Sequence, residues 1–129
     1  MSTYIEQYTT EKNAGVIDSL TPSLILFEDL AIQSIGDGIA EIIVMAVEQG
    51  GDFKTHVIKS IIHFRFNGSA DFLVIYNSNP TGYVLMGAGS LDAGNITTNR
   101  INVTLNFGAG MSTIEDCYIQ AYLKLVYEN

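Results

Sequence analysis

The sequence predicts an all-β protein with the architecture of an antiparallel β-sandwich, and three observations support this. Apolar and polar residues alternate with a period of two, as in residues 100–110, where Ile101, Val103, Leu105 and Phe107 alternate with Asn and Thr. Such runs recur about every ten residues and are separated by Gly, Asn and Asp. Helical periodicity is weak. Jelly roll is the topology that we favour, and an ordinary Greek-key sandwich is the alternative.

The chain divides into an arm and one domain. Its 129 residues suffice for a single core without disulfides. Residues 1–22 are polar, lack a sustained period and end at a Thr-Pro pair, so we expect an extended N-terminal arm followed by a sandwich domain at 23–129. Three residues of this arm are candidates for contact with a neighbouring chain: Tyr4, Ile5 and Tyr8.

Each predicted strand is a short apolar or alternating run between turn residues. The expected strands are residues 23–27, 30–35, 39–47, 56–66, 72–76, 83–89, 96–107 and 117–127. The sequence Gly-Asp-Gly at 36–38 predicts a tight hairpin between the second and third of them. Loops are expected at 49–52, 67–71 and 77–82, which are rich in Gly, Asn and Asp.

Two segments also fit a helix. Residues 112–127 contain two possible capping boxes, of which one pairs Ser112 with Glu115, and a helical apolar stripe. Tyr, Ile and Val dominate this segment, and its alternation is longer than the stripe, so we favour a strand. Residues 23–33, which follow Pro22, are the second alternative helix.

The strand at 39–47 is apolar on both faces. Ile39, Ile43, Met45 and Val47 would point to one side, and the even-numbered residues, including Ile42 and Val44, to the other. A strand with one face in water does not have this pattern. Either the domain covers both faces or a partner covers one of them, and we expect Ile42 and Val44 to belong to an oligomer interface.

Charge and hydropathy exclude several partners. The chain has 14 acidic and 6 basic residues, a net charge of −8, which disfavours nucleic acid and anionic membrane surfaces. The longest apolar run, 42–47, is too short to span a bilayer, and the N-terminus lacks a secretion signal. Synthesis in the cytoplasm is therefore expected. Cys117 has no partner for an internal disulfide and is expected to be a buried, inert thiol.

Residues that could perform catalysis or bind metal do not form a recognisable motif. His56 and His63 would lie on opposite faces of one strand. The paired carboxylates are adjacent in sequence, which separates them on a strand, and isolated Asp residues suit turns. The stretch Asp92–Asn95 lacks the alternating oxygen ligands of a calcium loop. We therefore expect no enzyme activity, no metal and no cofactor.

A carbohydrate- or receptor-binding module is the alternative function. Tyrosine rings stack on sugars, and Asn and Thr side chains hydrogen-bond to hydroxyl groups. The candidate residues for such a site are Tyr83, Asn99, Asn102, Thr104 and Asn106. The same polar row would also serve as a solvated sheet face.

The order of segments supports a structural role. A polar arm, "MSTYIEQYTTEKNAGVIDS", precedes turn-rich strands such as "IAEIIVMAV" and "FLVIYNSNPTGYVLMG", and the chain closes with "YIQAYLKLVYEN". This arrangement resembles the small β-sandwich proteins of bacteriophage and other virions, which include capsid decoration or cement proteins and fibre head domains. The resemblance implies a non-enzymatic subunit on the virion exterior, a homo-oligomer with three copies favoured, and contacts to a major capsid protein. A low charged fraction, 16%, agrees with surface used for such contacts.

Overall fold

The computed structural model describes residues 3–17, 23–32, 37–49, 55–66, 70–78, 82–89, 99–107 and 114–128. They form the strands β1 (Thr3–Ile17), β2 (Ser23–Ile32), β3 (Asp37–Glu48), β4 (Thr55–Phe66), β5 (Ala70–Asn77), β6 (Gly82–Ala88), β7 (Asn99–Phe107) and β8 (Ile114–Glu128). All pairings between these strands are antiparallel. The predicted fold class, an all-β antiparallel protein, is confirmed.

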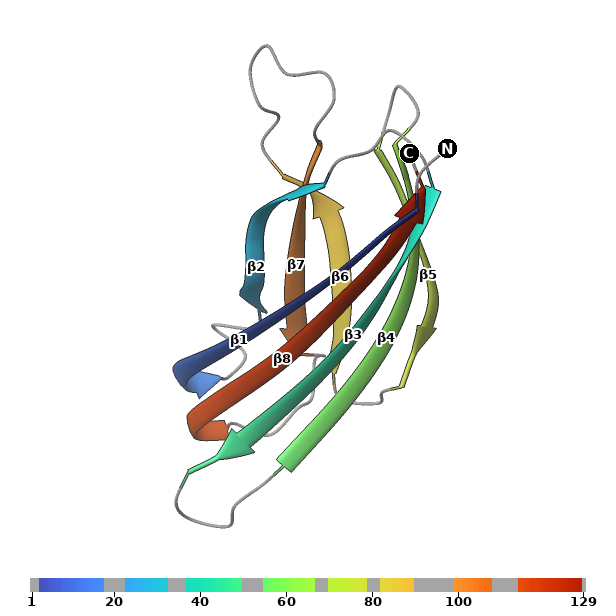
Figure 1. The fold of residues 1–129 in the computed structure, drawn as a ribbon. Helices are drawn as coiled ribbons and strands as arrows, with labels where there is room; N and C mark the ends of the chain where they lie inside the picture. Colours follow the sequence, from blue (N-terminus) through green and yellow to red (C-terminus); the bar gives the residue numbers. More distant parts are fainter. Residues whose placement is uncertain are drawn as a thin grey trace.

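The strands form two sheets packed face to face, which is the predicted sandwich (Figure 1). The larger sheet has five strands in the order β1-β8-β3-β4-β5, and the smaller has three in the order β2-β7-β6. The long strands of the larger sheet run obliquely across the shorter strands of the smaller one (Figure 1).

The order of the strands in the two sheets can be compared with the predicted jelly-roll topology. β1 lies beside β8 in one sheet, and β2 lies beside β7 in the other. In contrast, β3, β4 and β5 follow one another as a meander within the larger sheet, and the chain crosses to the smaller sheet for β6. A jelly roll is built from two Greek keys. Because of this meander, the strand order does not confirm the jelly-roll prediction.

The hydrophobic core lies between the sheets and comes from alternate residues along the strands. On β8 the odd-numbered side chains from Cys117 to Tyr127 are buried, and the even-numbered ones lie on the outer side. Consecutive odd residues would point around a helix instead of along one face. The strand interpretation of this segment is confirmed over Ile114–Glu128, and the helical alternative is wrong. Residues 23–32 likewise form β2 and not a helix.

The segment expected to be an arm is extended and is built into the larger sheet. β1 pairs with β8 from Thr3 to Ile17 and forms one edge of that sheet. Lys12 Nζ donates a hydrogen bond to the backbone oxygen of Ile25 on β2, which connects the edges of the two sheets. Residues 3–17 are therefore part of the sandwich.

β1 and β8 bend together near one end of the sheet (Figure 1). The register between them shifts on both sides of Gly15, which has a φ of +64°, and Asp116 on β8 has a φ of +48°. Both values lie in the left-handed region, which Gly adopts freely and Asp tolerates better than most residues. The bend thus occurs where the sequence has residues suited to it.

Gly38 is required for packing, and the hairpin predicted at Gly36–Gly38 is wrong. β2 and β3 belong to different sheets, so they do not pair. Gly38 begins β3, and a Cβ atom there would lie 2.5 Å from Tyr127 Cβ and closer still to the ring of Phe64. The glycine is needed because two large aromatic side chains approach the backbone at that position.

Candidate interaction surface

The outer face of the larger sheet carries a row of largely aliphatic side chains that crosses all five strands. The strand register sets one residue of each strand beside the next in the order Ile5, Val126, Ile39, His63 and Leu73. The four aliphatic members of the row are exposed. A continuous exposed apolar surface on a folded domain is typical of a contact surface for another molecule.

More exposed side chains extend this row over the three central strands. We refer to five exposed residues of β3, β4 and β8 as the outer patch: Ile39, Ile43, Met45, Val57 and Val126. Ile39 neighbours Val126, and Met45 neighbours Val57, across the strands. Three members line an open hollow of about 770 Å³ together with residues of β1 and β8 that include Thr9, Glu11, Gln120 and Tyr122.

Paired polar groups border the outer patch. Gln120 Nε2 donates a hydrogen bond to Glu11 Oε1 at 3.2 Å, and hydrogen bonds from Tyr118 and Gln120 hold the pKa of Glu11 below its ordinary value. Lys124 lies opposite Glu41 in the strand register. An apolar centre with a polar border is the usual anatomy of a protein–protein interface.

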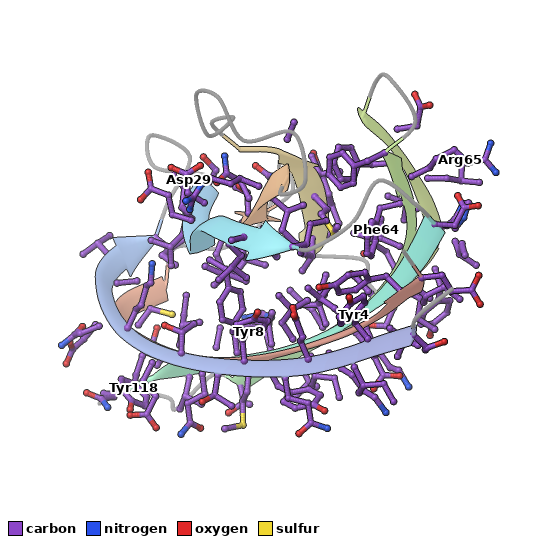
Figure 2. The ribbon with its side chains drawn as sticks, turned by 45° about the horizontal axis from the view of Figure 1, so that its top comes forward. Tyr4, Tyr8, Asp29, Phe64, Arg65 and Tyr118 are labelled. Atoms are coloured by element: carbon purple, nitrogen blue, oxygen red, sulfur yellow. The ribbon has the colours of Figure 1, made fainter. Side chains whose placement is uncertain are left out.

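The interface residues predicted from the arm are divided between the two faces of the larger sheet. Ile5 lies in the exposed outer row. Tyr4 and Tyr8 lie between the sheets, as Figure 2 shows. Tyr4 stacks on Tyr127 with ring centroids 5.2 Å apart, and the Tyr8 ring meets Phe27 edge-on at 6.4 Å. These two tyrosines thus pack against the chain's own core.

The two faces of the 39–47 strand have different surroundings, and this corrects the choice of Ile42 and Val44. Both side chains are fully buried between the sheets, where another chain cannot reach them. The opposite face, with Ile39, Ile43 and Met45, is exposed. Its apolar character was visible in the sequence, but the sequence could not say which face the smaller sheet covers.

The residues predicted for glycan binding lie on β6 and β7 of the smaller sheet. Tyr83 is exposed and lies directly opposite Asn106 in the strand register. Thr104 is half-buried beside Leu85 on the same face. Asn99 begins β7, and its side chain lies outside the described residues.

Asn102, the remaining member of this set, has a structural role in β2. Its Oδ1 accepts a hydrogen bond at 2.8 Å from the backbone N–H of Asp29, and Arg100 donates one at 2.8 Å to the Asp29 carbonyl oxygen. Asp29 has a φ of +48° at a register shift between β2 and β7. β7 therefore holds the irregular part of β2 through side chains of the polar row.

Asp37, His63 and Arg65 form a small group of titratable side chains on the outer surface, and His56 lies apart from them. His56 lies opposite the buried Ala46, and His63 opposite the exposed Ile39, so the two histidines occupy opposite faces of β4. Arg65 Nε donates a hydrogen bond to Asp37 Oδ1 at 2.6 Å on the outer surface, which holds the pKa of Asp37 below its ordinary value. Groups of three metal-ligating side chains do not occur among the described residues. The stretch Asp92–Asn95 lies outside them.

Within the same residues there is no helix long and apolar enough to cross a membrane. The structure thus defines an all-β sandwich with an exposed apolar outer patch.

Neither a protein-family model nor a curated protein matches the chain. Among solved structures, it is similar to the crystal structure of the Acinetobacter baumannii phage AM24 tailspike protein, with 10% identity and a TM-score of 0.38. That alignment covers 97% of this chain and 26% of the tailspike chain, so this chain spans about a quarter of its length.

Proposed function

We propose that this protein is a non-catalytic structural subunit that acts by binding neighbouring subunits through the outer patch. The observation that carries the proposal is the exposed aliphatic row across the larger sheet, which the chain's own second sheet does not cover. Burial of such surface contributes about 25 cal/mol per Å². Covering the exposed aliphatic side chains with another copy therefore stabilises the assembly, whereas a sheet face of polar side chains would gain little from being covered.

The resemblance of the sequence to small β-sandwich virion proteins supports a setting on a virion. In this proposal the subunit lies on the exterior of a virion, where it contacts further copies of itself and a major capsid protein. A net charge of −8 suits a position away from packaged nucleic acid. Three copies are the number that the resemblance implies.

The test is the mass of the protein in solution, measured by light scattering over a concentration series. Ile39→Lys places a charge in the outer patch, at a side chain that is 48% exposed. Leu85→Lys is the matched control, since Leu85 is 42% exposed on the outer face of the smaller sheet. We expect the Ile39→Lys variant to dissociate and the Leu85→Lys variant to keep the wild-type mass. A wild-type protein that stays at 14.1 kDa at every concentration would contradict the proposal.

Glycan binding is a second candidate, because Tyr83 and Asn106 are cross-strand neighbours on an accessible face. The aromatic ring offers a flat face for stacking, and the amide beside it can donate and accept hydrogen bonds. The test is saturable binding on a glycan array that is lost in both Tyr83→Ala and Asn106→Ala. Binding lost only in Asn102→Ala would not support this function, because that residue supports β2.

A further inference from the structure

The charged side chains on the outer face of the larger sheet balance one another, although the chain as a whole is acidic. On β1, β8, β3 and β4, the rows from Ile39 to Met45 contain four Asp, Glu, Lys or Arg residues on this face: Glu11, Lys124, Glu41 and Lys59. Two of them are acidic and two are basic, so this area carries no net charge, whereas the chain has a net charge of −8. Repulsion between two copies is therefore weakest where these areas meet.

Lys124 on β8 and Glu41 on β3 are register partners at the centre of this area. Both side chains point outward, because the residues before and after them in each strand are buried. The register pairs on either side of them are apolar or aromatic: Val126 with Ile39, and Tyr122 with Ile43. Within the described part of the chain, neither Lys124 nor Glu41 forms a salt bridge, so both charges can serve a contact with another molecule.

This arrangement is complementary to itself about a two-fold axis that runs parallel to the strands, above the boundary between β8 and β3. Rotation about such an axis lays β3 of a second copy over β8 and keeps each row in place. Lys124 then faces Glu41 of the second copy, and Glu41 faces its Lys124. Val126 faces Ile39 in the same reciprocal way. A two-fold contact requires this reciprocity, since each residue pair in it occurs twice.

The same rotation lays β4 of the second copy over β1. Lys59 is exposed on β4 and shares its row with Thr9, which is followed on the outer face of β1 by Glu11. Thr9 and Glu11 both line the open hollow of about 770 Å³. The long side chain of Lys59 from the second copy can reach into this hollow with its ammonium group near the Glu11 carboxylate. Each of the four charged residues of the area thus meets a residue of opposite charge.

The charges disfavour the other simple arrangement of two copies. A two-fold axis along the same row but perpendicular to the strands would set Lys124 against a second Lys124 and Glu41 against a second Glu41. Like charges opposed across an interface are costly. The axis parallel to the strands avoids this and keeps the strands of the two sheets aligned, as in the face-to-face packing of β-sheets about 10 Å apart.

We propose that two copies associate through the outer faces of their larger sheets, about a two-fold axis parallel to the strands between β8 and β3. This contact rests on the proposed function, because it uses the outer patch, and it adds the orientation of the second copy and the charge pairs that fix it. The contact ends at Val126 and Ile39, since the next outward residues, Glu128 and Asp37, are both acidic. A two-fold contact closes at two copies, so a dimer is expected in place of the three copies that the resemblance implies.

Two charge reversals test the pairing. Lys124→Glu places a carboxylate opposite Glu41 of the second copy, and Glu41→Lys places an ammonium group opposite Lys124. The dissociation constant is measured by analytical ultracentrifugation after circular dichroism has confirmed the fold. We expect each variant to raise it about tenfold or more, because two like-charge pairs replace two opposite-charge pairs. Net charge alone would weaken association in Lys124→Glu but strengthen it in Glu41→Lys, which makes the chain less acidic.

Glu28→Lys is the matched control for Glu41→Lys. It changes the net charge by the same amount at an exposed position on β2 of the smaller sheet, and it is expected not to raise the dissociation constant. Lys59→Glu and Glu11→Lys form a second pair of test variants at exposed positions, with the same expectation as the first pair.

A mixture of the Lys124→Glu and Glu41→Lys proteins tests the geometry of the contact. In the mixed dimer the two introduced side chains face each other with opposite charges, and the native Lys124 of one copy faces the native Glu41 of the other. Both contacts are thus restored. We expect the mixture to associate about tenfold or more tightly than either variant alone. An effect of the substitutions on folding would not be repaired by mixing.

The outcomes separate this contact from the proposed function. A wild-type protein that stays at 14.1 kDa at every concentration contradicts both. An oligomer that Ile39→Lys dissociates, but that the charge reversals leave intact, supports the outer patch and overturns the proposed orientation. Failure of the mixture to associate more tightly than the separate variants overturns the orientation as well. A closed trimer does the same, because a two-fold contact cannot close a ring of three copies.

Discussion

Tyr127 Oη donates a hydrogen bond at 2.9 Å to Glu6 Oε1, which joins the last strand of the chain to the first. The hydroxyl of Tyr8 donates to the other oxygen of the same carboxylate, also at 2.9 Å. Tyr4 stacks on the ring of Tyr127. This group holds β1 in the sheet through side chains as well as through backbone pairing, and it explains why a segment with so many polar residues is folded into the sandwich.

Tyr8 makes the free energy of unfolding depend on pH in the alkaline range. Burial and the nearby Glu6 carboxylate raise the pKa of Tyr8 to about 12, from an unfolded value of 10.0. The folded state thus favours the neutral phenol. This contribution to the free energy of unfolding is fully present below pH 10, declines between pH 10 and pH 12, and is absent above that range. Urea unfolding at pH 8 and at pH 11 measures the decline.

Tyr8→Phe is the matched variant for that experiment. It removes the hydroxyl and keeps the ring that packs against Phe27. We expect a loss of about 0.5–1.5 kcal/mol at pH 8, and a smaller further loss at pH 11 than in the wild type. Equal losses between the two pH values in both proteins would show that Tyr8 is not the group that titrates.

Gly38→Ala is expected to destabilise the protein by about 1–3 kcal/mol, because the new methyl group overlaps Tyr127 and Phe64. Gly87→Ala is the control, since a Cβ atom there meets nothing within 4 Å. Its effect is expected to stay within about 0.5 kcal/mol. Thermal unfolding followed by circular dichroism compares the two variants. A similar melting temperature for both would contradict the role assigned to Gly38.

Substitutions of Asp116 test how its left-handed backbone conformation affects the free energy of unfolding. Asp116 has a φ of +48° and an exposed side chain. Asp116→Val is expected to cost about 1–2 kcal/mol, because a β-branched residue fits this region poorly, whereas Asp116→Gly is expected to cost nothing or to stabilise. The backbone oxygen that accepts a hydrogen bond from Gln49 N at 3.0 Å is kept in both variants. Chemical denaturation of the two proteins gives the comparison.

Asn102→Ala is expected to lower the free energy of unfolding by about 1–3 kcal/mol, because the N–H of Asp29 loses its acceptor. Asn106→Ala, on the same face of β7, is expected to change it by less than about 0.5 kcal/mol. Equilibrium unfolding in urea separates the two. A larger effect of Asn106→Ala would mean that β7 supports β2 at a different point.

The alternation of side chains predicted the strands and most of the core. The buried odd residues of β8 and β7 were recognisable in the sequence because a period of two requires them to share a face. The partition of strands between sheets was not recognisable, since it depends on pairings between residues far apart in sequence. The hairpin expected at Gly36–Gly38 was wrong because β2 and β3 belong to different sheets. In addition, a glycine that is needed for close packing looks the same in the sequence as a glycine in a turn.

The candidate surface was predicted only in part. The two apolar faces of the 39–47 strand were visible in the sequence, and the structure shows that Ile39 and not Ile42 is accessible. Which face is covered depends on where the smaller sheet lies, and local sequence does not encode that. The opposite charges of Lys124 and Glu41 were present in the sequence, but their position beside each other depends on the pairing of β8 with β3.

Cys117 gives the protein an internal reporter of its own unfolding. Its thiol is fully buried beside Glu48 in the strand register, and burial raises its pKa. It is the single cysteine of the chain, so a thiol-specific reagent has one possible target. Because the thiol lies in the core between the sheets, the sandwich must open before the reagent can reach it, so the labelling rate measures how often that opening occurs, without any engineered probe.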